Sequence, residues 1–170
     1  MHKLITGTTL SGKSTLAKRL AGLYMEQGRK VLVLDELMDT QWPCSLLTDS
    51  PEEFKAIFWN SRSLAVFIDE AGESVGRYDK SMSMTATRGR HWGHICHYIT
   101  QRASMVARNV RGQCSEVYAF CCEPKDAETL SAEFVQPELL KAPNLAQGEY
   151  IHAVRFGVDK KPFYEYGKLF

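Results

Sequence analysis

The sequence has no uninterrupted apolar run of membrane-spanning length, although 44% of its 170 residues are hydrophobic. A helix that crosses a bilayer needs about 20 predominantly apolar residues, so we expect no membrane anchor. Met1 to Leu4 also run straight into the first predicted strand, so we expect no signal peptide. These absences favour a cytoplasmic location.

Strong net charge and paired cysteines are missing too. The 21 Lys and Arg residues nearly balance the 20 Asp and Glu residues, which leaves a formal net charge of +1. Any attraction to nucleic acid must therefore come from a local patch. The five cysteines are an odd number with no C-x-x-C pair, a pattern that favours reduced thiols over a disulfide framework.

No internal repeat, low-complexity tract or linker divides the chain, so we expect residues 1–170 to form a single domain. Apolar runs predict buried strands at residues 4–6, 31–35, 64–68, 94–100 and 116–122. Helical patterns occupy residues 15–23, 51–61 and 126–134, and we expect Ser50 and Asp126 to be the N-caps of the last two. The polar segment 72–90 is expected to be a loop or a loosely held helix. Residues 149–156 alternate and predict an antiparallel edge strand. This order predicts a three-layer α/β fold with a mainly parallel sheet.

Residues 7–14 read GTTLSGKS, a complete G-x-x-x-x-G-K-[ST] phosphate-binding loop between a predicted strand and a predicted helix. Backbone N–H groups of such a loop surround a β-phosphate at the positive end of the helix. Lys13 then reaches the β- and γ-phosphates, while the Ser14 hydroxyl ligates Mg²⁺. We expect nucleotide contacts from Gly7, Thr8, Thr9, Leu10, Ser11, Gly12, Lys13, Ser14 and Thr15. No N-K-x-D motif for guanine is present, which favours ATP.

Two adjacent carboxylates, Asp69 and Glu70, follow the apolar run 64–68. Ligands of open α/β folds bind at the carboxyl ends of the strands, where these side chains would lie. Asp69 is placed to complete the Mg²⁺ site begun by Ser14, and Glu70 to polarise a water for attack on the γ-phosphate. A water-activating carboxylate favours an ATP hydrolase over a kinase.

Gln101 ends the next apolar run, which is preceded by the turn sequence G-R-x-x-G at residues 89–93 and ends in Thr-Gln-Arg. If this strand lies beside the strand that carries Asp69, the Gln101 amide comes close to the γ-phosphate. It could then sense the phosphate or orient the attacking water.

Together, the order and spacing of these motifs over residues 3–122 resemble the FtsK/HerA group of P-loop motors. That group includes DNA translocases, packaging ATPases of some viruses and the Zot-like proteins of filamentous phages. The resemblance implies a RecA/ASCE-like core, with Lys13 and Ser14 on phosphate and Mg²⁺, Asp69 on Mg²⁺, Glu70 as catalytic base and Gln101 as sensor. Such motors generally act as rings in which an arginine reaches the neighbour's nucleotide. Arg90 is the first candidate for that arginine, followed by Arg88 and Arg102.

The resemblance thus implies a Mg²⁺-dependent ATP hydrolase that forms a homo-oligomeric ring and moves or packages DNA, in a host cytoplasm if the chain is phage-encoded. Two alternatives stay open. One is a small-molecule or nucleotide kinase, and the other is an ATP-dependent assembly or export factor that never contacts DNA.

Three further groups of residues allow more than one interpretation. His91, His94, Cys96 and His97 could suggest zinc, but alternation along a strand keeps four ligands from converging easily. The basic residues Arg77, Lys80, Arg88 and Arg90 could track DNA phosphates or form a solvated loop. The aromatic tail, with Phe163, Tyr164, Tyr166 and Phe170, is expected to be core or subunit-packing surface more than a base-stacking platform.

Overall fold

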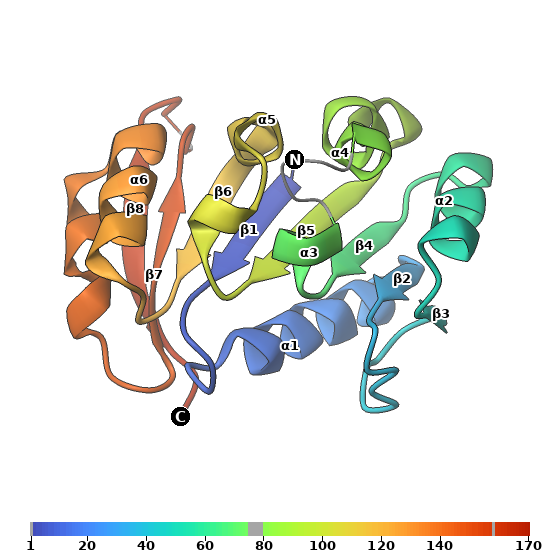
Figure 1. Ribbon diagram of the computed structural model, residues 1–170, viewed down its shortest axis with the longest axis horizontal. Helices are drawn as coiled ribbons and strands as arrows, with labels where there is room; N and C mark the ends of the chain where they lie inside the picture. Colours follow the sequence, from blue (N-terminus) through green and yellow to red (C-terminus); the bar gives the residue numbers. More distant parts are fainter. Residues whose placement is uncertain (1, 75–79, 158) are drawn as a thin grey trace.

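The computed structural model describes residues 2–74, 80–157 and 159–170 (Figure 1). Its described strands form one sheet in the order β3-β2-β4-β5-β1-β6-β7-β8. In chain order they are β1 (His2–Thr6), β2 (Val31–Leu34), β3 (Leu46–Thr48), β4 (Ala65–Ile68), β5 (Ile95–Thr100), β6 (Cys114–Ala119), β7 (Glu149–Val154) and β8 (Phe163–Lys168).

The helices alternate with these strands, as the sequence predicts. They are α1 (Lys13–Glu26), α2 (Pro51–Asn60), α3 (Ala71–Ser74), α4 (Lys80–Arg88), α5 (Arg108–Gln113) and α6 (Pro124–Phe134). Short 3₁₀ helices add η1 (Gly89–Trp92), η2 (Ala103–Met105) and η3 (Pro137–Asn144).

Strands β1 to β6 pair in parallel, whereas β7 pairs antiparallel with β6, and β8 antiparallel with β7. The predicted α/β fold with a mainly parallel sheet and an antiparallel C-terminal edge is confirmed. The edge itself is β8, not the predicted strand at residues 149–156, which lies one position further in as β7. Cys121 and Cys122 follow β6 and do not lie in it, contrary to expectation.

Helices cover both faces of the sheet and give it three layers. Helix α1 lies below the strands in Figure 1, while α4 and α5 lie above them. Ala71 of α3 belongs to the same buried cluster as Met82 of α4. Because successive strand residues point to opposite faces, Ile5 packs with Leu16 of α1, whereas Leu4 packs with Phe58 of α2 and Met82 of α4.

The starts of α2 and α6 depend on local sequence. Ser50 caps α2 as expected, because its Oγ accepts a hydrogen bond of 3.2 Å from the Glu53 amide, and Pro51 occupies the first helical position. Helix α6 begins earlier than predicted, at Pro124. Asp126 is therefore not its N-cap; it is buried in the first turn, where its Oδ1 accepts a hydrogen bond from Ser104 N at 3.1 Å.

Of the two alternatives expected at residues 72–90, a loop or a loosely held helix, Lys80–Arg88 forms a helix, α4, which is packed and not loosely held. Met82 and Ala86 are four residues apart, so they share one face, and both are fully buried against the sheet. Between them, the Thr85 hydroxyl lies 2.9 Å from the Tyr98 hydroxyl of β5. Arg77, one of the expected basic residues, lies outside the described residues.

Candidate nucleotide site

Strand order brings the predicted site residues to one edge of the sheet. Strands β4, β5 and β1 are neighbours and run in parallel, so their carboxyl ends meet. The phosphate-binding loop follows β1, Asp69 and Glu70 follow β4, and Gln101 follows β5. Three segments that are far apart in the sequence therefore converge where open α/β folds bind ligands.

The loop fits the space beneath it only because Gly12 has no side chain. Its φ of 117° lies in the region that L-residues avoid, and a Cβ there would lie 2.9 Å from Leu169 Cδ1. The first intrahelical hydrogen bond, from Leu16 N to Gly12 O at 3.0 Å, starts α1 at this point. The loop is thus held closely over the end of the chain, with the amide groups of the first turn of α1 available to an anion.

Lys13 is buried beneath the loop, with 7% of its surface exposed, and its Nζ donates a hydrogen bond of 2.8 Å to Thr8 O. Burial lowers the pKa of Lys13, while the nearby charges of Glu70 and Asp69 act in the opposite direction. The ammonium therefore lies inside the loop and close to both predicted carboxylates.

Asp69 is the second of the two carboxylates whose negative charges act on Lys13. Burial raises the pKa of Asp69 to about 6, and the charges of Asp35 and Glu70 add to this rise, whereas the Glu70 amide and Lys13 oppose it. Three neighbouring carboxylates and one lysine leave this region able to accept additional positive charge. The oxygen donors of Ser14 and Asp69 suit Mg²⁺, so the donor set and the local charge fit that ion.

Asp35, which follows β2, was not predicted as part of this region. Its carboxylate accepts hydrogen bonds from Trp42 Nε1 at 3.1 Å and from the Leu37 amide at 2.9 Å, and so fixes the loop after β2. The available signal was an acidic residue at the end of a buried strand, the same pattern that identified Asp69.

Gln101 connects the phosphate loop to Glu70. Its Oε1 accepts a hydrogen bond of 3.3 Å from the Thr9 hydroxyl, and its Nε2 donates one of 3.3 Å to Glu70 Oε1. Glu70 has a φ of 48°, unusual for a residue with a side chain, and its amide donates to Asp69 Oδ1 at 3.0 Å. The glutamate is thus held by its own backbone turn and by the amide of the neighbouring strand end.

Lys13, Glu70 and Gln101 line a cavity of about 430 Å³ together with residues of the phosphate loop. Two of its residues, Gln147 and Phe170, were not predicted to lie at the phosphate loop. The full lining consists of Thr9, Leu10, Gly12, Lys13, Ser14, Thr15, Glu70, Gln101, Gln147 and Phe170.

Neither a protein-family model nor a curated protein sequence matches the chain. Solved structures do. The genome packaging NTPase B204 of Sulfolobus turreted icosahedral virus 2, in complex with AMPPCP, is 16% identical with a TM-score of 0.79, covering 99% of this chain and 97% of that one. VirB4 of Thermoanaerobacter pseudethanolicus is 11% identical with a TM-score of 0.70, covering 99% and 89%. The pCW3 conjugation coupling protein TcpA is 16% identical with a TM-score of 0.69, covering 95% and 59%.

This chain has the fold of the FtsK/HerA-like P-loop ATPases. The resemblance that the sequence motifs indicated is confirmed at the level of the fold. None of the described helices has the length and apolar character needed to cross a membrane.

Within this FtsK/HerA-like fold, Arg90 lies at the edge of the sheet opposite the phosphate loop. It belongs to η1, which precedes β5, whereas the loop follows the parallel strand β1. Arg90 and Arg88 are both exposed. Arg102 is on the nucleotide side, but it forms an ion pair with Glu123 of its own chain. Of the three arginines, only Arg102 therefore lies at the same sheet edge as the candidate nucleotide cavity.

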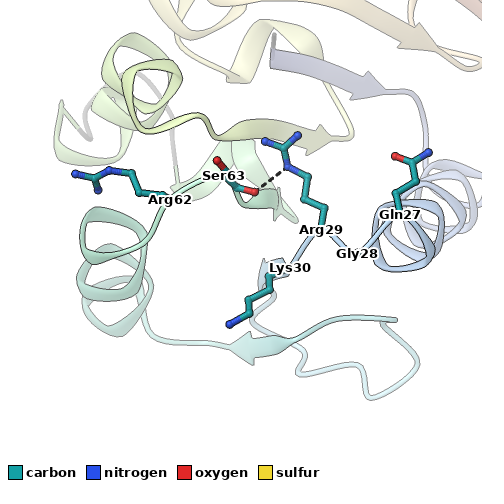
Figure 2. A pocket seen from close by; sticks show the side chains of 6 residues that line it. All are labelled: Gln27, Gly28, Arg29, Lys30, Arg62 and Ser63. Atoms are coloured by element: carbon teal, nitrogen blue, oxygen red, sulfur yellow. Dashed lines mark hydrogen bonds between the residues drawn. The ribbon is translucent and has the colours of Figure 1, made fainter.

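A basic pocket of about 490 Å³ lies at the same edge as Arg90 (Figure 2). Arg29 and Lys30 come from the loop before β2 and Arg62 from the loop before β4, and among the described residues no carboxylate lines it. Arg29 Nε donates to Ser63 O at 2.8 Å and joins the two loops, while Arg62 extends over the Trp92 ring, 5.1 Å from its centroid.

Two of the three histidines considered for zinc, His94 and His97, have other partners. His94 Nδ1 accepts from Leu64 N at 3.1 Å, and its Nε2 donates to Phe58 O at 2.9 Å. His97 donates to Val66 O at 3.0 Å and stacks on Phe67 at 4.1 Å, and burial lowers the pKa of His97 to about 3. The His94 ring therefore joins α2 to the residue before β4, and the His97 ring joins β5 to β4.

Proposed function

We propose that this protein is a Mg²⁺-dependent ATPase that acts as a subunit of an oligomeric motor for DNA translocation or packaging, of viral or phage type. The observation that carries the proposal is the hydrogen-bonded series Thr9, Gln101 and Glu70, which sets a carboxylate beside the phosphate loop. The fold shared with B204, a genome packaging NTPase solved with AMPPCP, supports the same proposal.

In this mechanism the loop amides and Lys13 bind the β- and γ-phosphates. Lys13 exchanges its hydrogen bond to Thr8 O for phosphate oxygens. Ser14 and Asp69 would hold Mg²⁺, which would neutralise charge on the phosphates. Glu70 accepts a proton from the attacking water, and Gln101 fixes the orientation of the Glu70 carboxylate.

Oligomerisation is proposed because an arginine at the sheet edge opposite the phosphate loop cannot reach the nucleotide bound to its own subunit. Arg90 lies at the amino ends of the strands, so only a neighbouring subunit could present it to the cavity. An arginine that stabilises charge on the transferred phosphate contributes on the order of 10³ to 10⁵ in rate. An isolated subunit should therefore hydrolyse ATP slowly.

DNA contact is proposed through exposed basic residues, since the net charge of +1 gives no general attraction. The candidates are Lys80 and Arg88 on α4, together with Lys30 and Arg62 of the basic pocket. Contacts of this type bind phosphates without reading sequence.

The decisive experiment measures ATP hydrolysis with and without duplex DNA and Mg²⁺. We expect hydrolysis to require Mg²⁺ and to rise with DNA, Lys13→Ala to lose nucleotide binding, and Glu70→Gln to bind ATP but barely hydrolyse it. Glu52→Gln, an exposed substitution on α2, is the matched control. Normal turnover by Glu70→Gln would refute the mechanism. A rate of ATP hydrolysis that DNA does not change would favour the assembly or export factor. Phosphate transfer to a small acceptor would reveal a kinase.

A further inference from the structure

We infer that Phe170, held against the phosphate loop by Gly148, forms the subsite for the base of the nucleotide and selects purines by stacking. The inference rests on the proposed function, because it assumes that the cavity holds a nucleoside triphosphate.

Besides Lys13 and Ser14, two separately fastened groups of residues line the cavity. In one, Thr9, Gln101 and Glu70 are joined by hydrogen bonds, and the proposed function places the γ-phosphate beside them. The other group consists of Gln147 and Phe170, which we take as the second end of the cavity. A triphosphate whose γ-phosphate faces Glu70 must direct its nucleoside away from that carboxylate, toward this second end.

The second end is fastened to the phosphate loop by main-chain hydrogen bonds. Gly148 N donates to Ser11 O at 3.0 Å, and Leu169 N donates to Gly148 O at 3.0 Å. Gln147 Nε2 adds a hydrogen bond of 3.0 Å to Leu10 O. In Figure 1 the last residues of the chain accordingly lie beside the loop between β1 and α1.

Gly148 also fixes the position of the Phe170 ring. Its φ is 82°, and a Cβ at this residue would lie 2.8 Å from Phe170 Cε2, so the ring rests directly on the glycine backbone. Leu169 next to it is buried, with 7% of its surface exposed, and packs against Gly12. The ring is therefore held from one side although it lies at the surface.

Phe170 nevertheless remains 65% exposed and lines the nucleotide cavity. A fixed aromatic ring that is open toward a polar, phosphate-binding cavity suits a flat heteroaromatic group, because every base has a face that can stack. A purine covers more of the ring than a pyrimidine does, so ATP should bind more tightly than CTP.

The test compares ATP, CTP and inorganic tripolyphosphate in binding measurements on the full chain. Phe170→Ala should weaken the binding of ATP about tenfold, as expected for the loss of one base–aromatic stack. The affinity for tripolyphosphate should not change. The difference in affinity between ATP and CTP should become smaller in the same variant. Phe156→Ala removes another ring that is 69% exposed, and it should change the affinity for neither ligand.

A second variant, Phe170→Trp, gives a direct signal. ATP, but not tripolyphosphate, should quench the added indole fluorescence above the background of Trp42, Trp59 and Trp92. If Phe170→Ala leaves the affinity for ATP unchanged, or lowers the affinities for ATP and tripolyphosphate equally, the proposed base subsite is wrong. Binding requires no turnover, so a protein that shows this pattern without hydrolysing ATP would refute the proposed ATPase and not the subsite.

Discussion

Gln101 Nε2 donates a hydrogen bond of 3.3 Å to Glu70 Oε1, which joins the ends of two neighbouring strands at the candidate nucleotide site. The other side of the same amide accepts a hydrogen bond from the Thr9 hydroxyl at 3.3 Å. Gln101 thus lies between the loop expected to hold phosphate and the carboxylate expected to activate water. A change at Thr9 on nucleotide binding would reach Glu70 through this amide.

Gln101→Ala should lower kcat about tenfold or more with little change in ATP affinity, because Glu70 loses the partner that orients it while Lys13 is untouched. Steady-state kinetics and a separate measurement of Kd would distinguish the two effects. Gln113→Ala, an exposed change at the end of α5, is the matched control. A loss of affinity as large as the loss of kcat would argue against an orienting role.

Mixing two inactive variants tests whether Arg90 acts on a neighbouring subunit. Arg90→Ala and Glu70→Gln should each lose hydrolysis, since one lacks the arginine and the other the base. Their mixture should regain part of the activity, because an Arg90→Ala subunit keeps Glu70 and can receive Arg90 from its neighbour. His91→Ala, an exposed change beside Arg90, should leave hydrolysis intact. A mixture that assembles yet stays inactive would exclude the shared site.

Stability should depend on pH through His152, which joins three strands. Its Nε2 lies 3.0 Å from Glu116 on β6 and its Nδ1 lies 2.9 Å from Glu165 on β8. Burial alone would lower the pKa of His152, but the hydrogen bonds to Glu116 and Glu165 outweigh it and raise the pKa above 6.5. The stabilising contribution is therefore fully present below pH 6.5 and lost as pH rises through the folded-state pKa.

His152→Asn should lower Tm more at pH 6 than at pH 9, as thermal unfolding at the two values would measure. At low pH a second effect enters, because His152 and Lys3 overcome the effect of burial and lower the pKa of Glu116 to about 2. That contribution is present above pH 4.5 and is lost as pH falls toward 2. An equal decrease in Tm at pH 6 and pH 9 would contradict a stabilising interaction of protonated His152 with Glu116 and Glu165.

The basic pocket should affect DNA and not basal hydrolysis. Lys30→Glu and Arg62→Glu should weaken binding to duplex DNA and reduce the steepness of its salt dependence, since each removes a cation available to phosphate. ATP hydrolysis without DNA, measured in parallel, should not change, because none of the residues that line this pocket lines the nucleotide cavity. Lys125→Glu on α6 is the control. DNA binding that Lys30→Glu and Arg62→Glu leave unaltered would remove this pocket from the interface.

The parts of the site that follow buried strands could be predicted from sequence. Parallel pairing places the carboxyl ends of β1, β4 and β5 together, so the locations of Lys13, Asp69 and Gln101 followed from three apolar runs with polar ends. The Gln101–Glu70 hydrogen bond needs the actual strand order, which places β4 beside β5. Sequence could suggest that order only through resemblance.

The contributions of Gln147 and Phe170 could not be predicted, because they depend on the path of the chain after β6. The hydrogen bond from Gln147 to Leu10 joins residues 137 positions apart, and no local pattern indicates such a contact. Strand β8 was missed for a related reason. Phe163, Tyr164 and Tyr166 are at least 40% exposed, so main-chain pairing with β7 defines this strand more than burial of its side chains.

The opposite positions of Lys13 and Arg90 on one sheet have a consequence for symmetry. If both serve one nucleotide, the contact between subunits must join two different surfaces, the carboxyl edge of one sheet and the amino edge of the next. Such a heterologous, head-to-tail contact cannot be completed by a two-fold dimer that presents the same face twice. It either closes into a cycle or continues as a helical filament, and the rotation between neighbours decides which.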